Sequence, residues 1–188
     1  IVATTGVGGT IHPLGVTSMR DGQDVTYSIT PDSPRFIIKD VLVDGESVGA
    51  QDSYTVTDQS RNHTIEAQFE AVYAVALSTG GDGSGGFDLS PPYHALQEGI
   101  AYYRKGTEVS LTAVAASDSI FDSWQVGSLC KGSFGCTFQV YSDVYEMVNF
   151  LLDSDQDDLP DAYENSVSLD PFDPTDARID SDSDRLTN

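Results

Sequence analysis

Acidic side chains recur at alternate positions in a short stretch near the end of the 188-residue sequence, DSDQDDLPDAYE at residues 153–164. Like charges this close together repel one another and disfavour a compact chain. The stretch is therefore either a solvated acidic linker or a set of oxygen ligands around a cation. The regular spacing favours the cation, because a solvated linker does not need its acids two residues apart.

Calcium is the metal that fits this spacing best. A loop of about twelve residues can wrap one Ca²⁺ with oxygens from roughly alternate positions, and the ion takes about six to eight hard oxygen ligands. Magnesium is the weaker candidate, because it prefers a tight octahedron and keeps several waters. The predicted ligands are the carboxylates of Asp153, Asp155, Asp157, Asp161 (directly or through water) and Glu164, with the backbone carbonyl of Leu159.

The sixth position of the loop departs from the usual pattern. Glycine is normal there, because the chain turns sharply with a positive φ angle. This sequence has Asp158 instead. Aspartate enters the left-handed region more readily than most residues, at some energetic cost. We therefore expect a weakened site and not a lost one.

A second copy of the pattern, DSDSDRLTN, occupies residues 180–188. Its sixth position is Arg185, and the sequence ends before the final ligand, so we expect the native chain to continue. Between the two loops, a proline-containing connector supplies three more acids that could reach an ion. The predicted ligands of the second loop are Asp180, Asp182, Asp184, the carbonyl of Leu186 and Asn188, and the connector acids are Asp170, Asp173 and Asp176.

The order DxDxDxLPDxYE, LDPxxPxDAxxD and DxDxDxLTN over residues 153–188 resembles the thrombospondin type 3 repeats of bacterial surface proteins. The resemblance implies that the residues named above are calcium ligands in a repeat segment of a surface or secreted protein. The glycines of the family's loops are missing here. The alternative interpretation is a disordered acidic linker.

The composition argues against several classes of partner. Thirty acids against nine Lys and Arg residues give a formal net charge of −21, whereas binding to nucleic acid or to anionic membranes needs clustered basic residues. No apolar run approaches the roughly 18 to 20 residues of a membrane span. We expect no nucleic-acid partner and no membrane span. Because the first residue is Ile, we also expect a mature or excised chain that lacks its initiator and any signal peptide.

Two cysteines, Cys130 and Cys136, lie in the stretch CKGSFGC. The intervening glycines allow the chain to fold back, which favours a short disulfide loop over two buried free thiols. Two cysteines are too few for a structural zinc site, and the CxxC redox spacing is absent. A disulfide would indicate an oxidising compartment, so we expect an extracellular or cell-surface location.

The sequence before the acidic segment predicts an all-β fold. Apolar residues alternate in DVTYSIT at residues 24–30 and in EVSLTAV at 108–114, which is the period of half-buried strands. The two stretches align, and each belongs to a unit that opens with a Gly-rich turn and closes with a strand ending in Phe69 or Phe150. One β unit thus occurs twice, with a period of about 80 residues. We expect two small sandwich-like modules, residues 1–70 and 71–151, followed by the acidic segment 152–188.

The first unit, with GGTIHPLG, DVTYSITPD, DVLVDGESVGA and NHTIEAQF, resembles the bacterial divergent internalin-B-type repeat. The second, with GTEVSLTAVA, FDSW, the cysteine pair and a final VNF, resembles a cysteine-containing variant of it. The resemblance implies a spacer, stalk or adhesive role without a catalytic centre. Trp124, with Tyr102 and Tyr103, could form a sugar-stacking platform. A core position is favoured, because Phe121 and Trp124 align with the apolar run FIIKDVLV of the first unit.

No catalytic motif is present, since the sequence lacks HExxH and GxSxG and neither cysteine has an adjacent histidine. A glycosidase needs only two carboxylates, so that reading stays open. We expect a non-enzymatic, calcium-rigidified structural or adhesive module of a bacterial surface protein or filament, with protein partners that could include its own copies. The alternatives are a carbohydrate- or protein-binding accessory region of a secreted hydrolase, which could hold polysaccharide, and a calcium-dependent docking module.

Overall fold

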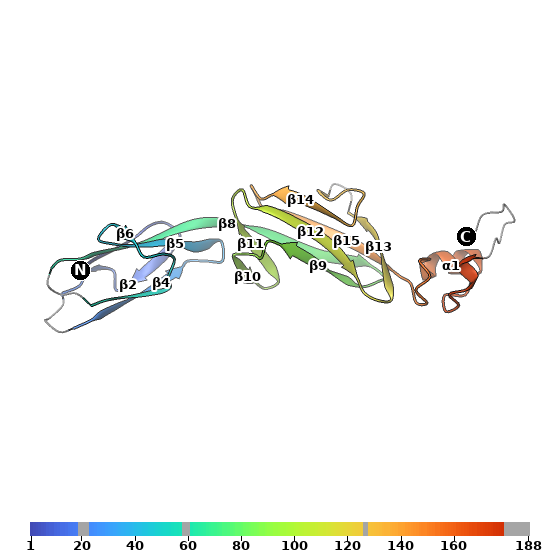
Figure 1. The fold of residues 1–188 in the computed structure, drawn as a ribbon, viewed down its shortest axis with the longest axis horizontal. Coiled ribbons are helices and arrows are strands. Elements are labelled where there is room, and N and C mark those ends of the chain that lie inside the picture. The colour runs from blue at the N-terminus through green and yellow to red at the C-terminus, as the bar shows by residue number, and fades with distance from the viewer. Residues whose placement is uncertain (19–22, 58–60, 126–127, 179–188) are drawn as a thin grey trace. The chain divides into compact units, whose positions relative to one another are not determined.

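A computed structural model describes residues 1–18, 23–57, 61–125 and 128–178. These residues form strands, one short α-helix and one 3-10 helix, which confirms the all-β class (Figure 1). No helix among them is long and apolar enough to cross a membrane. The elements are β1 Val2–Thr5, β2 Gly9–His12, β3 Gly15–Val16, β4 Val25–Pro31, β5 Phe36–Val43, β6 Glu46–Ser47, β7 Ser53–Val56, β8 Thr64–Gly81, β9 Gly85–Ser90, β10 Ala95–Gln97, β11 Ile100–Arg104, β12 Glu108–Ala115, β13 Ser119–Trp124, β14 Gly135–Gln139, β15 Val144–Leu152, α1 Asp161–Val167 and η1 Asp176–Arg178.

The chain divides into two compact units. Unit 1 comprises Ile1–Ala74 and His94–Thr107, and unit 2 comprises Val75–Tyr93 and the chain from Glu108 onward. These units differ from the ranges expected from the sequence repeat in two respects. The hairpin of β10 and β11 groups with unit 1, although it follows β9 in the chain, and the described part of the acidic segment groups with unit 2.

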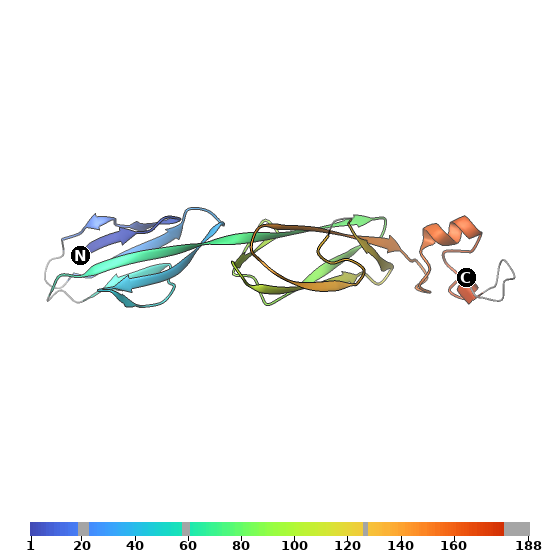
Figure 2. The same ribbon diagram turned by 90° about the horizontal axis from the view of Figure 1, so that it is seen from above.

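The strand pairing of unit 1 recurs in unit 2. In unit 1, β1 runs parallel to the first part of β8, β5 pairs antiparallel with β8, and β2, β4 and β7 form a second sheet. In unit 2, the last part of β8 runs parallel to β15, β13 pairs antiparallel with β15, and β9, β12 and β14 form the second sheet. Strand β8 is one continuous strand (Figure 2). It is the closing strand of the first repeat and the opening strand of the second.

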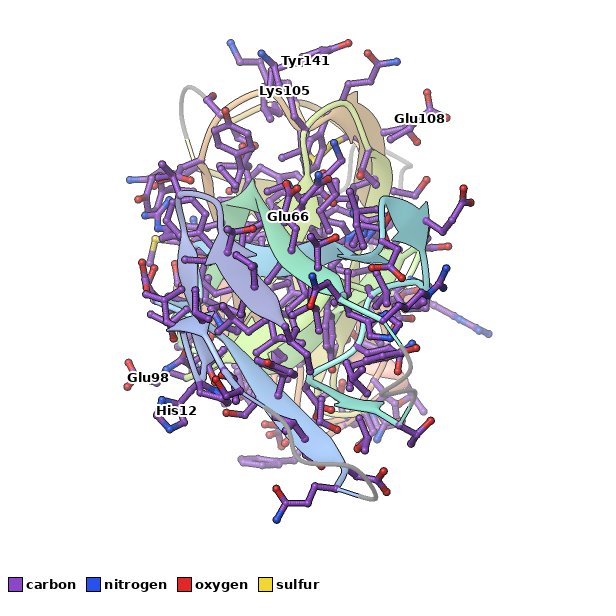
Figure 3. All side chains as sticks on the ribbon, turned by 90° about the vertical axis from the view of Figure 1, so that its left-hand side faces the viewer. His12, Glu66, Glu98, Lys105, Glu108 and Tyr141 are labelled. Carbon is purple, nitrogen blue, oxygen red and sulfur yellow. A yellow bond between two sulfur atoms is a disulfide. The ribbon has the colours of Figure 1, made fainter. Side chains whose placement is uncertain are left out.

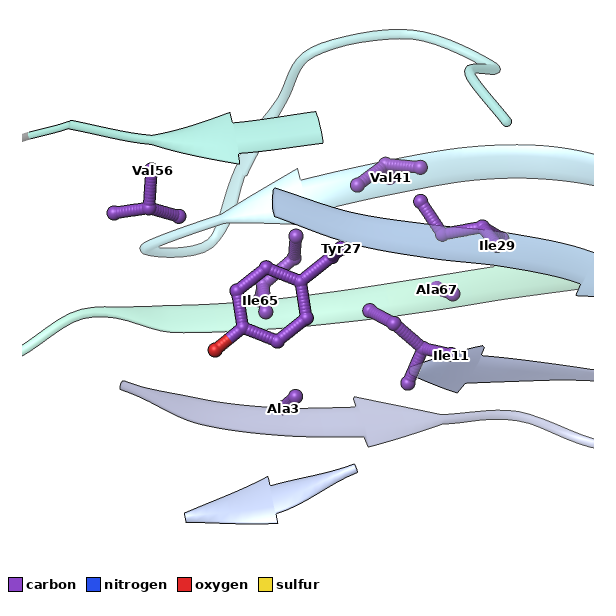
Figure 4. Packing of buried hydrophobic residues seen from close by; sticks show 8 residues of the cluster. All are labelled: Ala3, Ile11, Tyr27, Ile29, Val41, Val56, Ile65 and Ala67. Atoms are coloured by element: carbon purple, nitrogen blue, oxygen red, sulfur yellow. The ribbon is translucent and has the colours of Figure 1, made fainter. Parts of the chain in front are cut away.

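The core of unit 1 lies between its two sheets (Figure 4). Period-two alternation places Tyr27 and Ile29 of β4 on the buried face, opposite Val41 of β5 and Ile65 of β8. All four side chains are almost completely removed from water, which is the main stabilising contribution to a unit this small. The alternation read from the sequence therefore identified the buried face of this strand correctly.

Unit 2 has an equivalent core that includes the predicted disulfide. Cys130 and Cys136 are bonded, with Cα atoms 5.0 Å apart, which confirms the predicted bridge. Trp124 is 7% exposed, and its indole N–H donates to the carbonyl of Ser133 at 2.8 Å. Trp124 is thus a core residue, as the alignment favoured. Tyr102 and Tyr103, the other candidates for a sugar-stacking platform, are also buried.

A β-bulge recurs at the same place in both units. The extra residue is Lys39 in β5 and Asp122 in β13, and just before it Ile38 and Phe121 occupy equivalent positions. Ile38 lies within the run FIIKDVLV, with which the sequence aligned Phe121. A repeated bulge is part of the architecture, because it bends the strand and increases its twist.

Unit 1 is tied together by Asp44, which lies in the turn between β5 and β6 with a positive φ of 52°. Its carboxylate accepts the Thr64 N–H at 2.9 Å and contacts His63 Nδ1 at 2.8 Å, and Arg61 lies 3.3 Å away. The hydrogen bond from Thr64, followed by that of His63, lowers the pKa of Asp44. The turn is thereby fixed to the beginning of β8.

Unit 2 uses a buried acid, Glu146, for a similar purpose. Glu146 lies on the core-facing side of β15 and is 6% exposed. Its carboxylate accepts the backbone N–H of Leu129 at 3.0 Å and the hydroxyl of Ser128. The same hydroxyl oxygen accepts the N–H of Cys130 at 3.0 Å. Glu146 therefore holds the disulfide-bearing loop against β15.

We predict that Glu146→Ala lowers the free energy of unfolding of unit 2 by about 1–2 kcal/mol, because two partly buried hydrogen bonds lose their acceptor. Equilibrium denaturation of the oxidised chain measures this change. The control is Glu108→Ala, which removes an exposed carboxylate from β12 of the same unit (Figure 3). Equal stability of the two variants would refute the proposed tie.

Candidate metal site

The acidic segment begins directly after β15, and its first acid organises the loop. Asp153 is 2% exposed, and its carboxylate accepts backbone N–H groups of Gln156 at 2.8 Å, Asp157 at 3.3 Å and Asp158 at 3.2 Å. Asp158 has a φ of 76° and Gln156 a φ of 66°. The chain thus makes the sharp left-handed turn that was expected at Asp158, without a glycine.

A second set of hydrogen bonds closes the loop. The carboxylate of Asp161 accepts both the backbone N–H of Ser154, at 2.8 Å, and its hydroxyl, at 2.7 Å. The Leu159 N–H donates to one oxygen of Asp157 at 2.9 Å. The two ends of the loop are therefore joined by side-chain contacts within the loop itself.

Helix α1 positions Glu164. The carbonyl of Pro160 accepts the N–H groups of Tyr163 at 2.8 Å and Glu164 at 3.1 Å, which starts the helix. Acids in this first turn interact favourably with the helix dipole. The helix ends after seven residues at Ser168, whose φ is 66°. Glu164 is completely buried, which is rare for an acid without a partner.

The 3-10 helix η1 contributes Asp176, which is 8% exposed. One oxygen of Asp176 accepts the N–H of Asp170 at 2.7 Å, so the connector is folded back on itself. As a result, an acid twelve positions beyond Glu164 lies beside it.

These acids form two adjoining clusters. Within each, one oxygen per residue lies within 4.8 Å of the others. Because Asp157 belongs to both, the clusters are continuous. Acidic groups this close together could hold a metal ion. The members are Asp153, Asp155 and Asp157 in the first cluster, and Asp157, Glu164 and Asp176 in the second.

The strongest sign of a ligand is a set of buried carboxylate oxygens that accept no hydrogen bond from the described residues. They are both oxygens of Asp155, both of Glu164, Oδ2 of Asp157 and Oδ1 of Asp176. Burying a charged oxygen without a partner is strongly unfavourable. Four residues with six such oxygens match the donors that a hard divalent cation requires.

The metal-free electrostatics agree with this reading. Burial, and then the charges of Asp155 and Asp157, raises the pKa of Glu164 to about 7. Burial, followed by the charges of Asp157 and Asp153, also raises the pKa of Asp155. Both shifts mean that the folded segment disfavours its own negative charges when no cation is bound.

Other predicted ligands have different surroundings. Asp161 accepts two hydrogen bonds from Ser154 and belongs to neither side-chain cluster of the described chain. The carbonyl of Leu159 is a backbone ligand and stays a prediction. Asp170 and Asp173 are exposed and accept local hydrogen bonds, and those from Thr175 lower the pKa of Asp173. The second predicted loop, with Asp180, Asp182, Asp184, Leu186 and Asn188, lies outside the described residues.

Sequence reasoning missed the contact between Ser154 and Asp161. A serine in a loop is too common to carry a signal by itself. The sequence analysis also grouped Asp176 with Asp170 and Asp173 as a connector acid and did not single it out. One difference was available in the sequence: Asp170 and Asp173 directly precede prolines, which restricts their backbone, whereas Asp176 does not. This difference does not by itself predict that Asp176 lies beside Glu164.

Comparisons with protein-family models, with curated proteins and with solved structures found no match for this chain. The resemblances to internalin-B-type and thrombospondin type 3 repeats therefore stay proposals.

We predict that the metal-free segment is more stable in mild acid than in mild alkali. The folded segment holds the Glu164 proton more tightly than the unfolded segment, because the pKa rises from 4.5 to about 7 on folding. This stabilisation is complete below the unfolded pKa and is lost as the pH rises through the folded one. Urea denaturation with a chelator, at about pH 5 and about pH 8, measures the difference.

The control variant is Glu164→Gln, which is uncharged at both pH values. It should flatten the pH dependence that Glu164 contributes. A metal-free chain whose acidic segment is equally stable at both pH values, in the presence of Glu164, would contradict the geometry described above.

Proposed function

We propose that the acidic segment binds Ca²⁺ and that the chain is an extracellular structural or adhesive module of a bacterial surface protein, rigidified by that ion. One observation carries the proposal: six buried carboxylate oxygens of Asp155, Asp157, Glu164 and Asp176 lack hydrogen-bond donors among the described residues. A cation compensates such oxygens directly, because it supplies positive charge and accepts several ligands at once.

Calcium suits this donor set better than other metals. It takes about six to eight oxygens at roughly 2.3–2.6 Å, and it tolerates irregular geometry and bidentate carboxylates. Glu164 has both oxygens available, and so does Asp155. Magnesium demands a near-ideal octahedron and keeps waters, which a dry pair of carboxylates does not favour. Zinc is disfavoured, because the two clusters offer no nitrogen or sulfur ligand.

Calcium would couple binding to folding of the segment. Helix α1 has only seven residues, too few to be stable alone. The apolar side chains nearby are poorly buried, with Tyr163 42% and Phe172 75% exposed. The segment therefore has little hydrophobic stabilisation, and the free energy of ion binding becomes free energy of folding.

The two β units support a structural role. Each has a small core of its own, and they repeat one topology along the chain. The Cys130–Cys136 disulfide is typical of an oxidising compartment, in agreement with a cell-surface or secreted location. Protein partners, including further copies of the chain, are the expected binding partners of such a module.

We predict that Glu164→Ala weakens calcium binding by about a hundredfold, because it removes two ligand oxygens. The matched control is Asp173→Ala, which removes an exposed carboxylate of the same segment that belongs to neither cluster. Calorimetry with Ca²⁺ measures affinity, and limited proteolysis with and without chelator measures ordering. Sedimentation in the same two conditions tests for assembly.

The calcium proposal fails if the wild-type chain gives no heat of binding and the segment resists proteolysis equally with chelator. It also fails if Asp173→Ala weakens binding as much as Glu164→Ala does. Tighter binding of Mg²⁺ than of Ca²⁺ would contradict the choice of metal.

We predict that Asp158→Gly tightens calcium binding by about threefold, because glycine adopts the positive φ of 76° without strain. The control is Asp158→Ala, which removes the same carboxylate but keeps the β-carbon. Calorimetry of the two variants separates backbone strain from charge. Weaker binding by the glycine variant than by the alanine variant would show that the turn is not strained.

A further inference from the structure

A second feature of unit 2 lies outside the acidic segment. A cleft of about 480 Å³ opens between β13 and the disulfide loop, which is within the typical size of small-ligand sites. Most of its lining comes from one strand and the residue after it, and the rest from the loop. The lining residues are Phe121, Asp122, Ser123, Trp124, Gln125, Lys131 and Gly132.

One wall of the cleft is aromatic. Phe121 is half-buried and packs against Phe134, with ring centroids 5.0 Å apart and planes tilted by 50°. Phe134 is 66% exposed. Trp124 also lines the cleft, but its indole N–H is already donated to Ser133. Phe134 itself is not among the lining residues, so the aromatic lining consists of Phe121 and Trp124.

The remaining lining is polar and carries both signs of charge. The bulge at Asp122 puts an exposed carboxylate next to the aromatic wall, and this carboxylate accepts the Ser123 hydroxyl at 2.7 Å. Gln125 offers an amide, and Lys131 offers an exposed ammonium. The cleft can therefore both donate hydrogen bonds to a ligand and accept them from it. The formal charges of Asp122 and Lys131 cancel.

We propose that this cleft binds a neutral saccharide. A sugar ring has an apolar face of C–H groups that can lie against Phe121 and Trp124, and a rim of hydroxyls that both donate and accept hydrogen bonds. Asp122, Gln125 and Lys131 provide the matching acceptors and donors. The site is separate from the proposed calcium site, since the two share no residue.

Other ligand classes match the cleft less well. An anionic ligand would meet a chain of net charge −21 with a single lysine in the cleft, beside Asp122. An acyl chain would offer no hydrogen-bonding partner to the polar lining residues Asp122, Gln125 and Lys131. A neutral, hydroxyl-rich ligand satisfies both the aromatic wall and the polar groups.

Trp124 is the only tryptophan in the chain and lines the cleft, so its fluorescence reports binding directly. We predict saturable fluorescence changes when the full chain is titrated with at least one of three neutral probes: cellotriose, maltotriose and triacetylchitotriose. The expected dissociation constant is about 1 mM or lower. Phe121→Ala should weaken binding about fivefold, because one ring of the lining is lost. Because Phe121 also packs against the core of unit 2, Asp122→Ala, at an exposed lining residue, is the second variant and should weaken binding about twofold by removing an acceptor.

The control is Tyr141→Ala, which removes a largely exposed aromatic side chain of unit 2 that is not among the lining residues (Figure 3). This variant should bind the probes as the wild type does. Trigalacturonate, an acidic trisaccharide, should bind more weakly than the neutral probes. The titration is performed with Ca²⁺ and again with chelator, and the saccharide signal should persist in both.

Three outcomes would overturn the proposal. The first is the absence of a fluorescence change with all three neutral probes at about ten times the expected dissociation constant. The second is a change that both Phe121→Ala and Asp122→Ala leave intact or that Tyr141→Ala abolishes. The third is preferential binding of trigalacturonate. Because calcium binding is measured separately on the same chain, failure here is distinguishable from failure of the calcium proposal.

Discussion

The C-terminal segment depends on one electrostatic constraint, which is that several carboxylates are buried together without enough donors. Asp153 is satisfied by backbone N–H groups of its loop, and Asp161 by Ser154. Glu164 and Asp155 have no such partners in the described chain. When they are ionised their repulsion opposes folding, and α1 and the sparse apolar contacts contribute little to offset it. The hydrogen-bonded acids shape the loop, and the unpartnered acids require a cation.

The β units meet a different constraint, which is their small size. A unit of this length buries only a modest part of its surface, so a single tie contributes noticeably to stability. The first unit uses Asp44 to fix a turn to β8. The second uses Glu146 and the Cys130–Cys136 bridge to fix a loop to β15. One topology is thus stabilised in two ways, and in unit 2 the fixed loop also forms one wall of the cleft.

Much of the β architecture could be predicted from local patterns. Alternation identified the strands that became β4 and β12, and the glycine spacing in CKGSFGC indicated the disulfide loop. Alternation also places Glu146 on the same face of β15 as Val148 and Phe150, so its burial could have been predicted from the sequence. The continuity of β8 and the grouping of the β10–β11 hairpin with unit 1 were not predictable, because both depend on pairing between distant segments.

In the acidic segment, too, local features could be predicted from the sequence and contacts between distant residues could not. The spacing of Asp153, Asp155 and Asp157 and the positive φ at Asp158 followed from the sequence, because ligands within one loop are fixed by local geometry. The approach of Asp176 to Glu164 could not be derived, since it depends on how the connector folds back. Spacing rules also could not distinguish an acid that closes the loop, such as Asp161, from one that is left without a donor.

The most direct test of the calcium site is a crystal structure of the chain grown with Ca²⁺, with anomalous data to identify the ion. The account predicts one anomalous peak at roughly 2.3–2.6 Å from both carboxylate oxygens of Glu164 and from oxygens of Asp155, Asp157 and Asp176. A fully ordered segment in which these oxygens surround no peak, or in which the ion lies on Asp170 and Asp173 instead, would contradict it.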